Sequence, residues 1–252
     1  MQEVSPHAPA EAPELVLSVE GLSKRFGGVV AVDDCSFEVK RGSVVGIIGP
    51  NGSGKSTLFN LLTSVLRPDK GIVRHRGKRI DGLPLYEIAR QGIGRTYQSV
   101  KIFRDLSVWM NLEIAAMGRG RADWEVPARQ WLERFGLTHL VGDASDTLSV
   151  GQQRLLELAM NLAMSPDLLL LDEPLAGVNP VVRDTIADAV AALRREGKTF
   201  LIIEHHMNFV MRLCDKIVVM DHGEKIAEGV PEEIRRDERV INALLGKRAA
   251  RA

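Results

Sequence analysis

The sequence has little of several features that mark particular classes of protein. Only two of its 252 residues are cysteines, Cys35 and Cys214, and their separation suits neither a metal cluster nor a disulfide framework. No apolar run approaches the roughly 18 to 20 residues of a membrane-spanning helix, and no basic segment followed by an apolar stretch stands at the N-terminus. We therefore expect reduced thiols and a cytoplasmic protein, which could serve a membrane only by docking on other subunits.

An excess of charge of one sign is also missing. Lys and Arg together number 33, as do Asp and Glu, so the formal net charge is zero. This balance gives no electrostatic reason to expect nucleic acid as the main partner. Hydrophobic residues make up 45% of the chain, which is enough for one substantial core or for one core with an inserted subdomain.

Short apolar runs alternate with helical patterns along the chain, which predicts an α/β fold with a mainly parallel sheet. Three runs, at 44–48, 168–171 and 200–203, are the clearest predicted strands, and each ends directly in polar or glycine-containing sequence. Ligands gather beyond the carboxyl ends of parallel strands. The sequence therefore predicts that these three ends share one site.

Two regions depart from this alternation. Residues 15–40 contain two short β-like pieces separated by Gly27 and Gly28, which predicts an antiparallel β flank. Residues 98–164 have a helical pattern with apolar side chains on one face. The simplest summary is an α/β core into which a helical segment is inserted.

The predicted domain boundaries follow from these patterns. Residues 1–14, rich in Pro, Ala and Glu, are predicted to be a disordered lead-in. One domain is predicted at 15–246, with its core at about 15–97 and 165–246. The helical subdomain would occupy about 98–164, and residues 247–252 would form a basic tail.

The segment after the first predicted strand fits the phosphate-loop pattern G-x-x-x-x-G-K-[ST]. Its residues are Gly49, Pro50, Asn51, Gly52, Ser53, Gly54, Lys55, Ser56 and Thr57. A strand precedes the motif and a helical pattern follows it, which is the context that it requires. The glycines let successive N–H groups face an anion, and a helix N-terminus adds its positive end. We predict a bound nucleoside triphosphate, with Lys55 on the β- and γ-phosphates and Ser56 on Mg²⁺.

Polar residues with catalytic potential follow the other two predicted strands. Asp172 is predicted to hold Mg²⁺, and Glu173 to orient or deprotonate the attacking water, which contributes on the order of 10² to 10⁴ in rate. The alternative is a solvated acidic turn, which the nearby phosphate loop disfavours. Glu204, His205 and His206 follow the third strand. A histidine there could hydrogen-bond the γ-phosphate, but chemistry alone does not choose between the two.

The segment 148–152 has the sequence L-S-V-G-Q and precedes the amphipathic helical pattern. Together with the phosphate loop and the D-E-P of 172–174, it resembles the ABC ATPase signature L-S-G-G-Q, with Val150 in place of the first glycine. The resemblance covers about 15–245. It implies a P-loop NTPase core with a mainly parallel sheet, an antiparallel β flank near the N-terminus and an inserted helical subdomain.

This resemblance also implies how the residues are used. In the family, two subunits enclose two ATP molecules, and the signature of one contacts the γ-phosphate held by the other, a role that falls here to Ser149, Gly151 and Gln152. Gln98 resembles the glutamine that touches Mg²⁺ or water and faces the membrane partner. His205 resembles the switch histidine.

Three further positions differ in how well they fit the family pattern. Phe26 resembles the aromatic that stacks on adenine, although an ordinary core aromatic is the alternative. His206 stands where the family usually has an acid, and residues 176–179 replace the usual S-A-L-D. Contacts across the subunit interface are therefore expected to differ in detail.

A narrower likeness involves the segments I-G-R-T-Y-Q at 93–98, I-E-H-H-M at 203–207 and G-V-P-E-E-I at 229–234. They resemble ATP-binding subunits for branched-chain amino-acid uptake. Expected partners are transmembrane permease subunits, a second ATP-binding subunit (a sister chain or a second copy) and, indirectly, a solute-binding protein. ATP and Mg²⁺ are the implied cofactors, and the inner face of the membrane is the implied location.

Other functions remain as alternatives at this stage. The ATPase of a related importer for urea or amides, or of a lipopolysaccharide exporter, would have a similar sequence. A soluble ABC ATPase acting on ribosomes or DNA usually has two cassettes or a long coiled coil, and this chain has neither. A small-molecule kinase would not need the segment 148–152. Intact Lys55, Asp172, Glu173 and His205 argue against a non-hydrolysing cassette.

Overall fold

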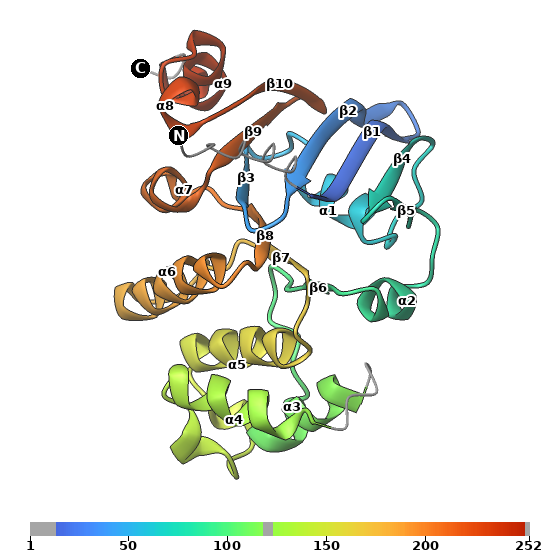
Figure 1. Cartoon of the computed structure of the whole chain (residues 1–252). Helices are drawn as coiled ribbons and strands as arrows, with labels where there is room; N and C mark the ends of the chain where they lie inside the picture. The colour runs from blue at the N-terminus through green and yellow to red at the C-terminus, as the bar shows by residue number, and fades with distance from the viewer. Residues whose placement is uncertain (1–13, 118–122, 250–252) are drawn as a thin grey trace, which may run out of the picture.

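The computed structural model describes residues 14–117 and 123–249 (Figure 1). The predicted disordered lead-in therefore lies outside the described residues, apart from Glu14, whose carbonyl accepts the backbone N–H of Arg41 at 2.8 Å. The end of the predicted basic tail, 250–252, lies outside them as well. In the described part of the chain, no helix has the length and apolar character needed to cross a bilayer.

The larger of two sheets in the described residues has the strand order β10-β9-β3-β8-β7-β6. All its neighbours are parallel except β10, which is antiparallel to β9. The strands are β3 (Val44–Ile48), β6 (Ile93–Arg95), β7 (Leu168–Asp172), β8 (Thr199–Ile203), β9 (Lys216–Asp221) and β10 (Glu224–Gly229). The mainly parallel sheet and its three predicted strands are confirmed.

The second sheet is antiparallel and has the order β2-β1-β4-β5. Its strands are β1 (Leu15–Phe26), β2 (Val29–Lys40), β4 (Lys70–His75) and β5 (Lys78–Arg79). The first two form a hairpin across Gly27, which has a φ of 57°, and Phe26 pairs with Val29. The predicted antiparallel flank is confirmed, but β1 and β2 are longer than the β-like pieces because they pair with each other as far as Phe26 and Val29. Strand β4 adds to the flank by pairing with β1.

Most of the helices in the described residues form three groups (Figure 1). Helix α1 (Lys55–Leu62) lies between the sheets, while α6 (Pro180–Arg195) and α7 (Met207–Leu213) cover the other face of the large sheet. Helices α3 (Val108–Met117), α4 (Glu125–Arg134) and α5 (Val150–Ala163) pack together at the bottom of Figure 1, as the predicted helical insertion requires. The remaining helical segments are α2 (Leu85–Arg90), α8 (Pro231–Ile234), α9 (Glu238–Ala249) and the 3₁₀ turns at Thr138–Leu140 and Ser145–Thr147.

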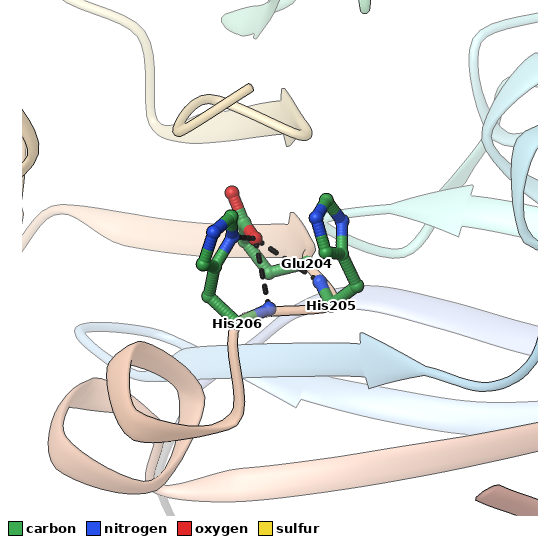
Figure 2. Close-up of side chains that lie close together, drawn as sticks. All are labelled: Glu204, His205 and His206. Carbon is green, nitrogen blue, oxygen red and sulfur yellow. Dashed lines mark hydrogen bonds and ion pairs between the residues drawn. The ribbon is translucent and has the colours of Figure 1, made fainter. Parts of the chain in front are cut away.

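The parallel register determines which loops meet. Ile47 of β3 pairs with Ile203 of β8, and Ile203 pairs with Asp172 of β7. The carboxyl ends of the three strands therefore lie at one edge of the sheet. The phosphate loop leaves from that edge, as does the segment Glu204-His205-His206 (Figure 2).

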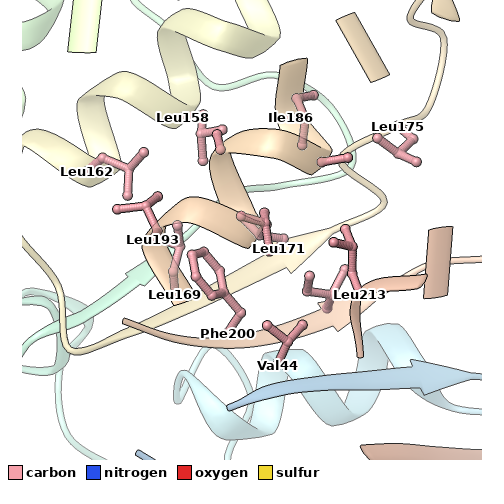
Figure 3. Close-up of a cluster of buried hydrophobic side chains, with 14 of the residues drawn as sticks. Val44, Leu158, Leu162, Leu169, Leu171, Leu175, Ile186, Leu193, Phe200 and Leu213 are labelled. Carbon is pink, nitrogen blue, oxygen red and sulfur yellow. The ribbon is translucent and has the colours of Figure 1, made fainter. Parts of the chain in front are cut away.

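The apolar runs of the parallel strands are buried on both faces, which explains why they show no alternation with polar residues. Val45 and Ile47 belong to a cluster with α1 and the antiparallel sheet. Val44 belongs to a second cluster, which includes Phe200 of β8 and Leu193 of α6 (Figure 3). This double burial holds the site-bearing edge rigidly between helices.

Candidate nucleotide site

The phosphate loop runs so close to neighbouring backbone that two of its positions accept only glycine. Gly54, the N-cap of α1, has a φ of 101°, and a Cβ there would lie 2.2 Å from the carbonyl oxygen of Ala31. Gly49 has a φ of 154°, and its Cβ would lie 2.1 Å from the carbonyl oxygen of Met220. Contacts this short are impossible for a side chain, so the path of the loop depends on both glycines.

Lys55 is held across this loop. Its Nζ donates to the carbonyl oxygens of Gly49 and Pro50, both at 2.8 Å, and lies 3.4 Å from Ser53 Oγ. Burial lowers the pKa of Lys55, while the nearby carboxylates of Glu173 and Asp172 act in the opposite direction. The ammonium group of Lys55 therefore lies inside the curve of the loop. The negative charges of Glu173 and Asp172 favour its charged form.

A cavity of about 350 Å³ adjoins the loop. Its volume is in the range of small-molecule sites. Strand β2, the loop with the first turn of α1, and two residues from elsewhere contribute to its wall. They are Val29, Val30, Ala31, Asn51, Gly52, Gly54, Lys55, Ser56, Thr57, Gln98 and Glu173.

Phe26 lies beside this wall and not in the core. It pairs with Val29, and 47% of its surface is exposed. Lys24 Nζ lies 5.7 Å from the centroid of its ring. The core-aromatic alternative is therefore wrong, because an exposed ring next to the cavity is free to stack on a planar ligand.

The acid pair is divided between two environments. Asp172 is buried, and its carboxylate lies 3.6 Å from Arg95 Nη2. Burial raises the pKa of Asp172, and Arg95 opposes that shift. Its backbone N–H donates to Thr96 Oγ1 at 3.3 Å. A buried carboxylate that is not in close contact with a cation is well suited to a further positive charge.

Glu173 turns into the cavity because the chain bends sharply after the strand. Its φ is 47°, in the left-handed region that is rare for residues with a side chain. Its backbone N–H donates to the carbonyl oxygen of Ile203 at 3.0 Å. The carboxylate accepts a hydrogen bond from Gln98 Nε2 at 3.2 Å and lies 3.9 Å from His205 Nδ1. The structure thus brings Gln98, Glu173 and His205 together.

The two adjacent histidines have different surroundings (Figure 2). One oxygen of the fully buried Glu204 accepts the backbone N–H groups of His205 and His206, at 3.0 and 3.2 Å, and lies 3.0 Å from His206 Nδ1. The other oxygen accepts the backbone N–H of Leu175 at 2.9 Å. His206 is therefore tied to Glu204, whereas the ring of His205 lies beside Glu173.

Glu204, His205 and His206 have the spacing of metal ligands, since their candidate ligand atoms lie within 4.8 Å of one another. Glu204, however, already uses both of its oxygens for four donors. We therefore assign it to holding the loop after β8 in place. Nothing in the sequence pattern singled out Glu204 for this task.

The segment 148–152 lies apart from the cavity of its own chain. Ser149 is the exposed N-cap of α5, where its Oγ accepts the backbone N–H of Gln152 at 3.3 Å and Gln152 Oε1 accepts the backbone N–H of Ser149 at 2.9 Å. A Cβ at Gly151 would lie 2.9 Å from Val182 Cγ2, so a larger residue there would force the Val182 side chain of α6 to move. Val150 is 57% exposed. This capping box presents a helix N-terminus to solvent.

Sequence reasoning missed the buried polar residues that support the site. Arg95 Nη1 donates to Thr63 Oγ1 at 2.6 Å, and Nη2 donates to Asn60 Oδ1 at 2.8 Å, which joins β6 to α1. Arg154 and Glu157 form a buried ion pair on α5. Opposite charges three residues apart on an otherwise apolar helical pattern are the one signal that could have revealed this pair.

Family-level comparisons agree with this geometry. The sequence model of the ABC transporter family matches residues 32–176. That of the branched-chain amino acid ATP-binding cassette transporter family matches residues 224–250. The two matches together cover the phosphate loop, the segment 148–152, the acid pair and the C-terminal helix.

Individual relatives match over nearly the whole chain. The high-affinity branched-chain amino acid transport ATP-binding protein BraF of Pseudomonas aeruginosa is 40% identical, over 92% of this chain and 98% of its own length. The protein LivG of Escherichia coli K12, with the same description, is 38% identical with the same coverage. A solved structure, described as the ADP conformation of an ATP-binding cassette of an ABC transporter, is 34% identical with a TM-score of 0.83, over 92% of this chain and 99% of that one.

These matches exclude the small-molecule kinase alternative, since they extend across the phosphate loop, the signature segment and the acid pair alike. The chain therefore belongs to the ABC transporter ATP-binding family, and it is an ATP-binding, ATP-hydrolysing subunit of a transporter complex whose partners are membrane permease subunits.

Proposed function

We propose that this chain is an ATPase subunit of an importer of branched-chain amino acids and that it works as one of a pair. The observation that carries the paired arrangement is the composition of the cavity. The phosphate loop, Gln98 and Glu173 line it, whereas no residue of 148–152 does. The exposed N-terminus of α5 is therefore available to complete the cavity of a companion, either a second copy or a sister subunit.

Mg²⁺ fits the oxygen donors at this site. Ser56 and Gln98 line the cavity, and the carboxylate of the buried Asp172 lies 3.6 Å from Arg95 Nη2. The amide nitrogen of Gln98 faces Glu173, which leaves its oxygen as a ligand. Hydroxyl, amide and carboxylate oxygens are ligands that Mg²⁺ accepts. The ion would neutralise charge on the transferred phosphoryl group.

The residues of this chain then have separate tasks in hydrolysis. Lys55 binds the β- and γ-phosphates, and the N–H groups of the phosphate loop enclose them. Glu173 orients the attacking water and takes its proton. His205, which lies beside Glu173, donates a hydrogen bond to the γ-phosphate. Phe26 stacks on the adenine.

Closure of the pair follows from the same geometry. Ser149, Gly151 and Gln152 of each subunit add contacts to the γ-phosphate that the other subunit holds, so ATP joins the two. Hydrolysis removes the γ-phosphate and with it those contacts, so the pair reopens. Gln98, at the junction with the helical group, would pass this motion to the permease subunits.

The solute assignment is supported by the relatives, which are described as branched-chain amino acid transport proteins, and by the C-terminal family match at 224–250. An importer of this kind places the chain on the cytoplasmic face of the membrane. A solute-binding protein would deliver the amino acid on the opposite side.

Transport measurements test this proposal. A complex purified from native membranes by a tag on this chain is reconstituted in liposomes with its solute-binding protein. We expect ATP-dependent uptake of labelled leucine, isoleucine or valine. Uptake of urea or short amides, with no uptake of these three amino acids, would refute the solute assignment. An ATPase rate per molecule that stays constant on dilution to demonstrated monomers would refute the paired site.

A further inference from the structure

Helix α5 carries a buried ion pair that the mechanism above does not use. Arg154 Nη1 lies 3.0 Å from Glu157 Oε2, and their side chains are only 4% and 3% exposed. Burial raises the pKa of Glu157, and Arg154 opposes that shift. Two buried charges are costly unless further hydrogen bonds satisfy them. The partners of the pair therefore indicate what it does.

Among the described residues, the further hydrogen-bond partners of these two side chains belong to one short segment of backbone around Gln98. Arg154 donates through Nη1 to the carbonyl oxygen of Tyr97 at 2.6 Å, and through Nη2 to that of Gln98 at 2.7 Å. Glu157 Oε1 accepts the backbone N–H of Lys101 at 3.0 Å and that of Tyr97 at 3.4 Å. The ion pair thus holds the backbone on both sides of Gln98, at Tyr97 and Lys101. The side chain of Gln98 contacts Glu173.

The N-terminal end of this segment, at Arg95, is attached to α1 of the nucleotide-binding core. Arg95 donates to Asn60 of α1, the helix that begins in the phosphate loop, and to Thr63, which caps the end of that helix. It also lies 3.6 Å from Asp172. Residues 95–101 therefore connect the nucleotide-binding core, through Arg95, to α5, through the ion pair. Gln98 stands between the two attachments.

Helix α5 begins at the segment that would contact the companion's nucleotide. Arg154 follows Ser149 by five residues, a distance of about 7.5 Å along a helix at 1.5 Å per residue. Both positions belong to one uninterrupted helix, Val150–Ala163, with Ser149 as its N-cap. A shift of its N-terminus is therefore passed to the carbonyl groups that Arg154 holds.

We propose that Arg154 and Glu157 are positioning residues that fasten the backbone of 97–101 to α5, so that docking of the signature segment on the companion's nucleotide sets the place of Gln98 relative to Glu173. This inference rests on the paired site proposed above. Neither residue lines the nucleotide cavity of its own chain. The pair lets each subunit register, at its own Glu173, whether its companion has ATP bound.

The test replaces both charges together, because removal of one would leave the other buried and unpaired. Arg154→Met/Glu157→Met keeps the size and helix propensity of both side chains and removes every contact to 97–101. Leu158→Ala is the matched control. It destabilises the same helix from the face that packs in the apolar cluster, and it leaves the ion pair in place (Figure 3). Arg154→Lys, which keeps the charge but loses the fork, is the conservative variant.

Amide hydrogen exchange in the nucleotide-free protein is the first measurement. The double variant should exchange the N–H groups of Tyr97 and Lys101 roughly tenfold faster, with β3 unchanged. Leu158→Ala should leave these two amides as they are in the unmodified chain, and Arg154→Lys should lie between. Equal exchange at 97–101 in the double variant and the unmodified chain would overturn the attachment, whatever the fate of the paired-site proposal.

The second measurement is made on Glu173→Gln protein with ATP and Mg²⁺, whose dimer is followed by light scattering. Exchange at 97–101 should change on dimerisation when the ion pair is present and should not change in the double variant, although the dimer still forms. In the Glu173-containing protein, the double variant should keep its affinity for a fluorescent ATP analogue within about twofold and lose about 10- to 100-fold in kcat. An identical response of 97–101 to dimerisation with and without the pair would overturn the proposal. A Glu173→Gln protein that fails to dimerise would instead count against the paired site.

Discussion

Substitution of Glu173 by glutamine separates chemistry from binding at this site. Glutamine has the same length, and its oxygen can still accept the hydrogen bond from Gln98 Nε2, which is 3.2 Å long in the unmodified protein. It cannot take a proton from water at neutral pH. Glutamate and glutamine have the same steric cost at the φ of 47° found here, so we expect the bend after β7 to be kept.

The size of the effect follows from the role. A positioned general base contributes on the order of 10² to 10⁴ in rate, so kcat should fall by that factor, or about 2.7 to 5.4 kcal/mol at 1.36 kcal/mol per tenfold. Loss of the attraction between Glu173 and Lys55 costs at most about 1 kcal/mol, since the pair is partly solvated. A change of this size moves Tm by about 2 to 4 °C at most.

Nucleotide binding should survive the same substitution. The phosphate loop is untouched, and the removal of one negative charge from the cavity wall reduces repulsion of the triphosphate. We therefore expect Glu173→Gln to bind ATP at least as tightly as the unmodified protein and to persist as a closed dimer. Single-turnover hydrolysis, binding of a fluorescent ATP analogue and light scattering measure the three properties separately.

Glu196→Gln is the control for loss of a carboxylate, because Glu196 is exposed and its ion pair in the described residues is with Arg134, at 3.7 Å. Its ATPase rate should equal that of the unmodified protein. A Glu173→Gln protein that hydrolyses ATP within tenfold of the normal rate would show that another group is the base. One that binds no ATP would show that the carboxylate supports the loop and not the reaction.

Three further predictions concern the rest of the site. Lys55→Ala should lose at least about 10²-fold in ATP affinity or turnover, since it removes the one cation of the loop; unchanged values for both would remove the assignment. Burial raises the pKa of Asp172 above that of a free aspartate. The apparent affinity for Mg²⁺ should therefore fall as the pH drops through this raised pKa, because the protonated carboxyl no longer binds the ion. Titrations of ATPase activity with Mg²⁺ at several pH values measure this, and a pH-independent affinity would contradict it. Glu204→Gln replaces one of the two carboxylate oxygens, which accept backbone N–H groups, with an NH₂ group. This costs about 1 to 3 kcal/mol of unfolding free energy for each donor left unpaired. Urea denaturation of the nucleotide-free protein checks this, with an unchanged midpoint as the opposing result.

The parts of the fold that could be predicted are those whose signal is local. The strand at 44–48 was predicted with its observed bounds, because a short apolar run ends in a glycine-rich loop. By contrast β6, Ile93–Arg95, is too short to show a period, and its place at the sheet edge depends on pairing with β7. Strand β4 was missed for a similar reason, since its partner β1 lies about fifty residues earlier in the chain.

The two histidines after β8 show the same division at the level of single residues. They are neighbours in the sequence, and chemistry alone gave neither a preference. In the structure Glu204 holds His206 Nδ1 at 3.0 Å, while His205 lies 3.9 Å from Glu173. The difference between the two rings comes from the fully buried carboxylate of Glu204, which contacts His206 and not the ring of His205.

By itself the sequence determined the phosphate loop, the adjacent acid pair and the signature segment, because each works through residues that are consecutive along the chain. Only the tertiary structure decided that Gln98 meets Glu173, 75 residues away, and that Arg154 holds the backbone beside Gln98 from 56 residues away. Contacts between distant segments depend on sheet register and helix packing. Local patterns carry no record of either.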